Sequence, residues 1–130
     1  MLNGLSRLEP YAYSLLRIGS GVLFVCHGLQ KFGLFGGIGG SAVEFTSRLG
    51  AAAVIEVIAG TLIAIGLMTV PAAFVASGEM AFAYALAHYP MGRWPIQNGG
   101  ELAVLYCLLF LFVVTRGPGP VSLDRALKRR

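Results

Sequence analysis

The 130-residue sequence contains little charge: 12% of its residues are charged and 56% are hydrophobic, with a mean hydropathy of +0.74. An average soluble domain carries about 25% charged residues, so this chain has too few polar side chains to cover a water-exposed surface. The high apolar content excludes an intrinsically disordered chain. The sequence therefore predicts an integral membrane protein with one domain over residues 1–130.

Cysteine is also scarce, because only Cys26 and Cys107 are present and they form no Cys-x-x-Cys pair. Two cysteines exclude a disulfide-rich scaffold. Their expected depths in the membrane are similar, so a thiol pair that passes electrons to a quinone remains an alternative. Buried cysteine is more often a small apolar side chain, and we expect that these two are not a required redox pair.

Positive charge is concentrated near the C-terminus, in Arg125, Lys128, Arg129 and Arg130. No stripe of interleaved aromatic and basic residues accompanies this tail, which argues against a nucleic-acid partner. Beside an apolar segment, such a tail indicates membrane orientation or contact with anionic lipid.

Four apolar segments are about long enough to cross a bilayer. No segment alternates strictly between apolar and polar residues, so transmembrane strands are not expected. The predicted fold is all-α, a transmembrane up-down four-helix bundle. Its spans are expected at about residues 11–32, 51–70, 71–88 and 101–116.

The basic residues outside these spans predict the orientation of the bundle. Four spans place both termini on one side of the membrane. That side carries more basic residues than the other, with Arg7, Arg116, Arg125, Lys128, Arg129 and Arg130 against Lys31, Arg48 and Arg93. The positive-inside rule then predicts that both termini are cytoplasmic.

Several ionisable side chains fall within or beside the expected spans, where an unpaired charge costs about 2.5–3.5 kcal/mol even on lenient scales. The helical rise places His27 and Glu56 level with each other, about 7–8 Å below the outer boundary. Further polar side chains lie nearer that boundary. We therefore expect a polar pocket in the outer half of the bundle, with the ligand-binding candidates His27, Lys31, Glu56, His88 and Glu101.

Arg17 and Glu79 are expected to form an intramembrane charge pair, because Glu79 is the only acidic residue near mid-membrane. The alternative for Arg17 is to extend to the cytoplasmic headgroups. Nine residues separate Glu79 from His88, which is half a turn out of phase on a straight helix. Both can face one spot only if the helix unwinds near Pro90.

The remaining polar groups leave two further interpretations open. Glu56, paired with His27 or Lys31, could only hold helices together. His27 and His88 lie on two helices without further ligands, so neither a haem nor another metal site is predicted.

Four stretches of the sequence, in chain order, carry a family pattern: Leu16–Gly19 with His27–Gly33, Ile55–Gly60 with Gly66–Thr69, Ser77–Ala81 with Ala87–Pro90, and Trp94–Glu101 with Gly117–Asp124. Together they resemble the DoxX family of small four-helix bacterial membrane proteins. The resemblance covers nearly the whole chain and implies a multi-pass protein of the bacterial inner membrane.

The function implied by the resemblance is that of an accessory subunit of a quinone-linked redox or oxidative-stress system. A quinone is then the candidate cofactor, and the lipid bilayer and redox-complex subunits are the candidate partners. A non-catalytic scaffold or assembly factor remains one alternative, and a small-solute or proton pathway remains another. The motifs identify a family rather than a reaction, so no catalytic residue is assigned and the oligomeric state is left open.

In the quinone interpretation, two polar residues of the pocket carry the chemistry. His27 and Glu56 would exchange protons with a bound quinol. Apolar walls that suit a lipid-soluble ligand are expected from Phe24, Ile63 and Leu105.

Overall fold

The structure is a computed structural model that describes residues 2–128. In this part of the chain the secondary structure is helical, apart from an isolated bridge between Ile38 and Ser41. The elements in chain order are α1 (Leu2–Leu5), η1 (Ser6–Leu8), α2 (Glu9–Lys31), η2 (Leu34–Gly36), α3 (Arg48–Ile65), α4 (Thr69–Ala83), η3 (Tyr84–His88), η4 (Tyr89–Met91), α5 (Pro95–Asn98), α6 (Glu101–Arg116) and α7 (Leu123–Lys128).

The main helices are α2, α3, α4 and α6, which confirms the predicted all-α four-helix fold. Three helical stretches are long and apolar enough to cross a membrane: Ser6–Lys31, Arg48–Ile65 and Thr69–Met91. The fourth helix, α6, begins and ends where the sequence predicts, but its 16 residues make it shorter than an ordinary span.

Local chemistry explains where α3 begins and ends. The Ser47 hydroxyl accepts a hydrogen bond from the Gly50 amide at 3.1 Å, which caps the N-terminus of the helix. The helix ends at Ile65 rather than near residue 70, because Gly66 adopts a left-handed conformation with φ of 71°. A turn of only a few residues then leads into α4, so α3 and α4 form a tight hairpin.

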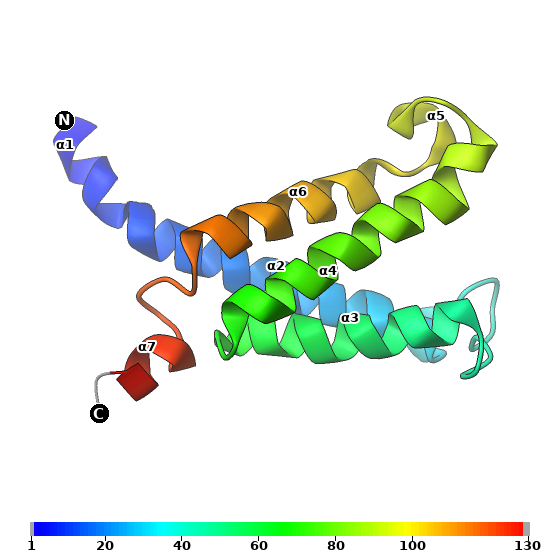
Figure 1. Cartoon of the computed structure of the whole chain (residues 1–130), viewed down its shortest axis with the longest axis horizontal. Coiled ribbons are helices and arrows are strands. Elements are labelled where there is room, and N and C mark those ends of the chain that lie inside the picture. The colour runs from blue at the N-terminus through cyan, green and yellow to red at the C-terminus, as the bar shows by residue number, and fades with distance from the viewer. Residues whose placement is uncertain (1, 129–130) are drawn as a thin grey trace.

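The two ends of the bundle differ in what they contain (Figure 1). Both described termini lie at one end, together with the α3–α4 turn, and we call this the terminal end. The two longer connections, residues 32–47 and 92–100, lie at the opposite end, which we call the loop end.

The four helices pack as two pairs, α2 with α3 and α4 with α6. Glycines set the close approach within the first pair. A Cβ atom on Gly21 would lie 2.6 Å from the Ala64 amide nitrogen, and one on Gly60 would lie 2.8 Å from the Gly21 carbonyl oxygen. The pairs are joined at the α3–α4 turn and diverge toward the loop end (Figure 1).

Aromatic side chains fill the space between the two pairs. Phe24 of α2 is fully buried against Phe110 and Tyr106 of α6, with ring centroids 4.9 Å and 5.4 Å away. Ile63 and Val113 are also fully buried in this core. The core therefore closes the bundle on the terminal side of Phe24. At the loop end, where the helix pairs diverge, a space remains between them.

Candidate functional site

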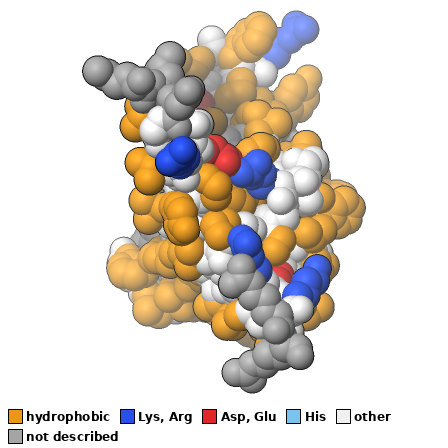
Figure 2. Space-filling model, turned by 90° about the vertical axis from the view of Figure 1, so that its left-hand side faces the viewer, with side chains coloured by type: hydrophobic (Ala, Val, Ile, Leu, Met, Phe, Trp, Pro, Cys, Tyr) orange, Lys and Arg blue, Asp and Glu red, His pale blue; other side chains and the backbone are white. Residues whose placement is uncertain are grey.

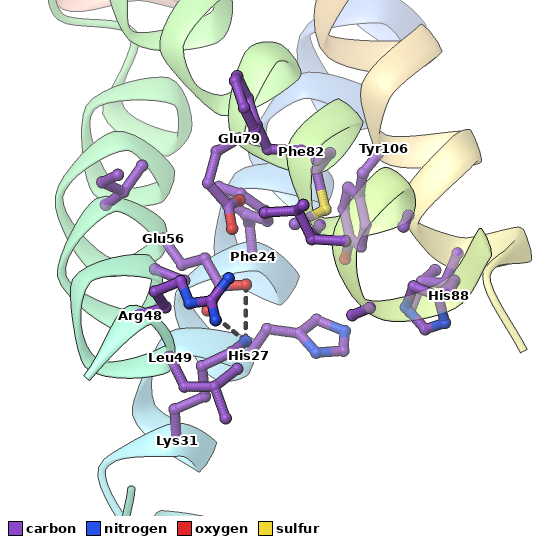
Figure 3. A pocket seen from close by; sticks show the side chains of 18 of the residues that line it. Phe24, His27, Lys31, Arg48, Leu49, Glu56, Glu79, Phe82, His88 and Tyr106 are labelled. Carbon is purple, nitrogen blue, oxygen red and sulfur yellow. Dashed lines mark hydrogen bonds and ion pairs between the residues drawn. The ribbon is translucent and has the colours of Figure 1, made fainter. Parts of the chain in front are cut away.

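A cavity of about 780 Å³ lies between the diverging helix pairs at the loop end (Figure 3). Its wall is built from α2, α3, α4, η3 and α6, together with Gly99. Most of the lining is apolar. The polar side chains that line it are His27, Lys31, Arg48, Glu56, Glu79, His88 and Tyr106.

Lys31 and Glu56 form an ion pair on one wall of the cavity (Figure 3). The Lys31 ammonium nitrogen donates to both carboxylate oxygens of Glu56, at 2.8 Å and 2.6 Å. The Glu56 side chain is 2% exposed and that of Lys31 is 14% exposed. Each charge thus balances the other in a site that water scarcely reaches.

His27 does not share this pair, although the sequence places it level with Glu56. Its ring packs edge-on against Tyr106 of α6, with centroids 5.8 Å apart. Of the two partners expected for Glu56, the structure selects Lys31. His27 and Tyr106 instead link the two helix pairs across the cavity.

His88 reaches the cavity because α4 changes its winding. After Ala83 the helix widens into the π-turn η3, in which the Tyr89 amide bonds to the Tyr84 carbonyl. Pro90 lacks an amide hydrogen and would clash with the carbonyl four residues earlier in an α-helix, which explains the change. The added rotation lets Glu79 and His88 line one cavity.

The connection after η3 holds the His88 ring in place. The Nδ1 atom of His88 bonds to the backbone carbonyl of Asn98 at 3.1 Å, and the ring stacks on Tyr84. The buried Asn98 side chain in turn bonds to the Gly92 carbonyl at 2.8 Å and accepts from the Gly100 amide at 2.9 Å. Asn98 therefore orders both the loop and the histidine.

Glu79 is the least satisfied polar group of the cavity. Its Oε2 atom is buried and has no hydrogen-bond partner among the described residues. In Figure 3 its side chain extends from α4 into the cavity, on the side of the Glu56 carboxylate. A buried carboxyl oxygen without a partner marks a place where a ligand or water would bind.

The predicted charge pair between Arg17 and Glu79 is not formed. The fully buried Arg17 guanidinium points toward the terminal end, where it donates to the carbonyls of Ile63 and Val121, and to that of Ala64 at 3.0 Å. The carbonyls at the end of α3 carry the negative end of its dipole, so they attract this cation. Glu79 lies further along α4 and faces the cavity.

Three other expectations need correction. Glu101 is exposed at the start of α6 and does not line the cavity. Phe24 lines the cavity as expected, but Ile63 belongs to the closed core and Leu105 is 62% exposed on the outer face of α6. Sequence reasoning missed Tyr106, for which the aromatic spacing on α6 gave no distinct signal.

Arg48 was also missed as a cavity residue. The sequence indicates for Arg48 only a contribution to membrane orientation, because this residue lies outside the expected span 51–70. The structure places it on the cavity wall, near the Lys31–Glu56 pair in Figure 3.

The two cysteines are free and half-buried. Cys107 lies 3.6 Å from the Ser77 hydroxyl, which also donates to the Cys107 carbonyl at 2.8 Å. This contact joins α4 to α6. Among the described residues no group of three or more His, Cys, Asp or Glu side chains is placed to hold a metal ion.

Residues 117–124 fold back across the terminal end, and we call them the strap. The Tyr13 hydroxyl donates to the Gly117 carbonyl at 2.5 Å, and Asp124 accepts from the Met68 amide and the Thr69 amide, each at 2.9 Å. Asp124 thus caps the N-terminus of α4. Partial burial by itself would raise the pKa of Asp124, but these hydrogen bonds and the nearby Lys128 hold it below its usual range.

Comparison with known proteins decides the family. The DoxX family model matches residues 12–89, a segment that holds α3, α4 and every charged side chain of the cavity. The chain belongs to the DoxX family. As a DoxX protein it is an integral, multi-pass membrane protein, in agreement with its long apolar helices.

Two relatives match almost the whole chain. An uncharacterized protein of Haemophilus influenzae is 42% identical over 129 residues, which cover 95% of this chain and 96% of the relative. An uncharacterized membrane protein of Mycobacterium tuberculosis is 30% identical over 139 residues, which cover 93% of this chain and 84% of the relative. No solved structure gives a significant match.

Proposed function

We propose that this DoxX protein binds a lipid-soluble molecule with a polar head, a quinone being the candidate, in the loop-end cavity. It would act as an accessory subunit of a quinone-linked redox or oxidative-stress system in the bacterial inner membrane. The observation that carries the proposal is the cavity itself. Apolar walls surround a small set of convergent polar groups, which is the usual character of a small-molecule site.

The rim of the cavity supports entry from the bilayer. Leu49 of α3 is 46% exposed, and Phe82 and Leu86 on the opposite wall are 70% and 59% exposed. Exposed apolar side chains in a membrane-spanning helix face lipid. A ligand dissolved in the bilayer would therefore pass between α3 and the α4–η3 helix without crossing water.

The charges of the cavity favour a neutral ligand. Lys31 and Arg48 supply two positive charges, and Glu56 and Glu79 supply two carboxyl groups. The Lys31–Glu56 pair is already matched, so the wall has no large excess of either sign. A neutral head with hydrogen-bonding atoms suits such a wall better than a phosphate or carboxylate does.

The closed core argues against the proton-pathway alternative. Such a pathway would have to connect the cavity with Arg17 at the terminal end. Phe24, Ile63 and Phe110 are fully buried between them and offer no polar atom to a proton. The scaffold alternative is the one that the experiment below has to separate from ligand binding.

We propose that both termini face the cytoplasm, so that the loop end and the cavity lie in the periplasmic half of the membrane. Figure 2 looks onto the terminal end and shows Lys and Arg side chains gathered there. The described members of this group are Arg7, Arg116, Arg125 and Lys128. Arg129 and Arg130 lie outside the described residues. The distribution follows the positive-inside rule.

The test is to purify the protein from native membranes in mild detergent and to identify extracted lipids by mass spectrometry. A stoichiometric quinone in the wild type is expected. Ala83→Trp, which fills the cavity, should lose it, whereas Ala81→Trp on the exposed side of the same helix should keep it. An empty wild-type protein that binds neither added decyl-quinone nor its quinol would refute the proposal and leave the scaffold interpretation.

A further inference from the structure

The ring of His88 is fixed in one orientation at the edge of the cavity. The π-turn η3 carries it there, stacking on Tyr84 holds its plane, and the Asn98 carbonyl holds its Nδ1 atom. The buried Asn98 side chain is itself held by three groups, so the carbonyl cannot readily move away. The structure therefore determines which edge of the ring is left for a ligand.

This contact also determines the tautomer. A carbonyl oxygen can only accept a hydrogen bond, so Nδ1 of His88 must carry the hydrogen that is shared with Asn98. In a neutral imidazole the other nitrogen, Nε2, then has a lone pair and no hydrogen. Nε2 has no hydrogen-bond partner among the described residues.

The neighbouring polar groups do not supply the missing hydrogen. Both carboxylate oxygens of Glu56 already accept from Lys31, and that ion pair lies on the far wall from His88 in Figure 3. Glu79 adds a buried oxygen without a partner. On the His88 side of the cavity, Nε2 is thus a hydrogen-bond acceptor without a donor among the described residues.

We propose that His88 makes the cavity selective for ligands that carry a hydroxyl group, which donates its hydrogen to Nε2. This inference rests on the proposed function, because it assumes that the cavity holds a lipid-soluble ligand. It goes further in naming the group that is recognised and the residue that recognises it. An aromatic diol would satisfy the site, whereas its methyl ether or a dione would leave Nε2 without a partner.

Binding of matched probes to the protein in lipid nanodiscs tests the selectivity. An alkyl hydroquinone is expected to bind about five- to tenfold more tightly than its dimethyl ether, the loss expected for one buried hydrogen bond. His88→Phe should remove this preference while keeping the affinity for the ether. The matched control is Tyr89→Phe, because Tyr89 is exposed and does not line the cavity.

The tautomer can be measured without any ligand. Long-range ¹⁵N–¹H spectra of histidine-labelled protein should show His88 with its hydrogen on Nδ1, and His88→Gln assigns the signal. A hydrogen on Nε2 would overturn the inference whatever the cavity binds. Equal affinity for the hydroquinone and its ether would also overturn it and leave the proposed function standing, whereas absence of binding by either probe would refute both.

Discussion

Lys31 of α2 and Glu56 of α3 form a buried ion pair in which one ammonium group bonds to both oxygens of one carboxylate, at 2.8 Å and 2.6 Å. The pair joins the two helices on one wall of the loop-end cavity. It supplies two of the four Lys, Arg and Glu groups that line the cavity. Its energetics can be tested independently of any ligand.

Removing one member of this pair should cost far more than removing both. Lys31→Met leaves a buried carboxylate without its partner, and we expect a loss of about 3–5 kcal/mol in the free energy of unfolding. The double variant Lys31→Met/Glu56→Leu should recover most of that loss. Denaturation in detergent, followed by circular dichroism, measures both.

The exposed Arg116–Glu9 pair provides the control, because its side chains are 38% and 53% exposed. Glu9→Gln should cost less than about 1 kcal/mol. A double variant at Lys31 and Glu56 no more stable than Lys31→Met would show that the pair contributes through packing rather than through charge.

Replacing a glycine of α2 by alanine should change the thermal stability according to the space beside that glycine. Gly21→Ala puts a methyl group 2.6 Å from the Ala64 amide nitrogen, so the helices must separate and we expect a loss of about 1–3 kcal/mol. Gly19→Ala, two residues away, meets nothing within 4 Å and should be neutral or stabilise by up to about 1 kcal/mol. Equal effects of the two changes on thermal stability would contradict the close approach.

Because of Asp124 in the strap, the free energy of unfolding should depend on pH in the acidic range. The folded pKa of Asp124 lies below its usual range, so its contribution is complete above the unfolded pKa of about 3.9 and is lost as the pH falls through the folded pKa. Asp124→Asn should flatten the stability profile in this acidic window. Asp124→Ala, which removes the cap of α4, should cost about 1 kcal/mol at neutral pH. An unchanged acid limb in the Asn variant would argue against this role.

Arg17 and Glu79 should behave as independent sites. Arg17 bonds to backbone carbonyls at the terminal end and Glu79 faces the cavity. The losses in stability from Arg17→Met and Glu79→Gln should therefore add to within about 0.3–0.5 kcal/mol. A larger coupling energy in the double-mutant cycle would show that the two side chains meet.

Reporter fusions test the orientation of the protein in the membrane. Alkaline phosphatase fused after Arg130 should be inactive, because cytoplasmic termini keep it from the periplasm. The same enzyme inserted between Gly40 and Ser41, in the loop-end connection, should be active. The reversed pattern would place the cavity in the cytoplasmic half of the membrane.

The sequence predicted most of the fold, because the hydropathy of the side chains indicates where the membrane-spanning helices lie. Hydropathy located the four helices, and the predicted span 101–116 has the bounds of α6 in the structure. The predicted span 51–70 runs past the end of α3 at Ile65, because a helix that stops at Gly66 before more apolar residues looks continuous on hydropathy alone. Helical rise was enough to place His27, Lys31 and Glu56 in the same half of the bundle, where all three line the cavity.

The failures have a common physical origin. The sequence predicted Glu79 as the partner of Arg17, because sequence patterns suggest partners among charged side chains. The actual partners are backbone carbonyl oxygens, whose positions do not depend on residue type. His88 is not one of these failures, because the sequence indicates that it can face the pocket if the helix unwinds near Pro90, and the π-turn supplies that change; the form of the turn was not predicted. The positions of the carbonyls and the form of the turn both depend on backbone geometry, which periodicity does not encode.

The strap has a consequence for the order in which the protein is made. Arg17 and the first turn of α4 receive partners from Val121 and Asp124, which leave the ribosome only after all four long helices have been synthesised. Until then, a buried cation and exposed amides at the terminal end lack those bonds. A nascent chain can thus insert its helices early but completes its tertiary structure late, so a translational stop upstream of the strap should yield an inserted, protease-sensitive bundle.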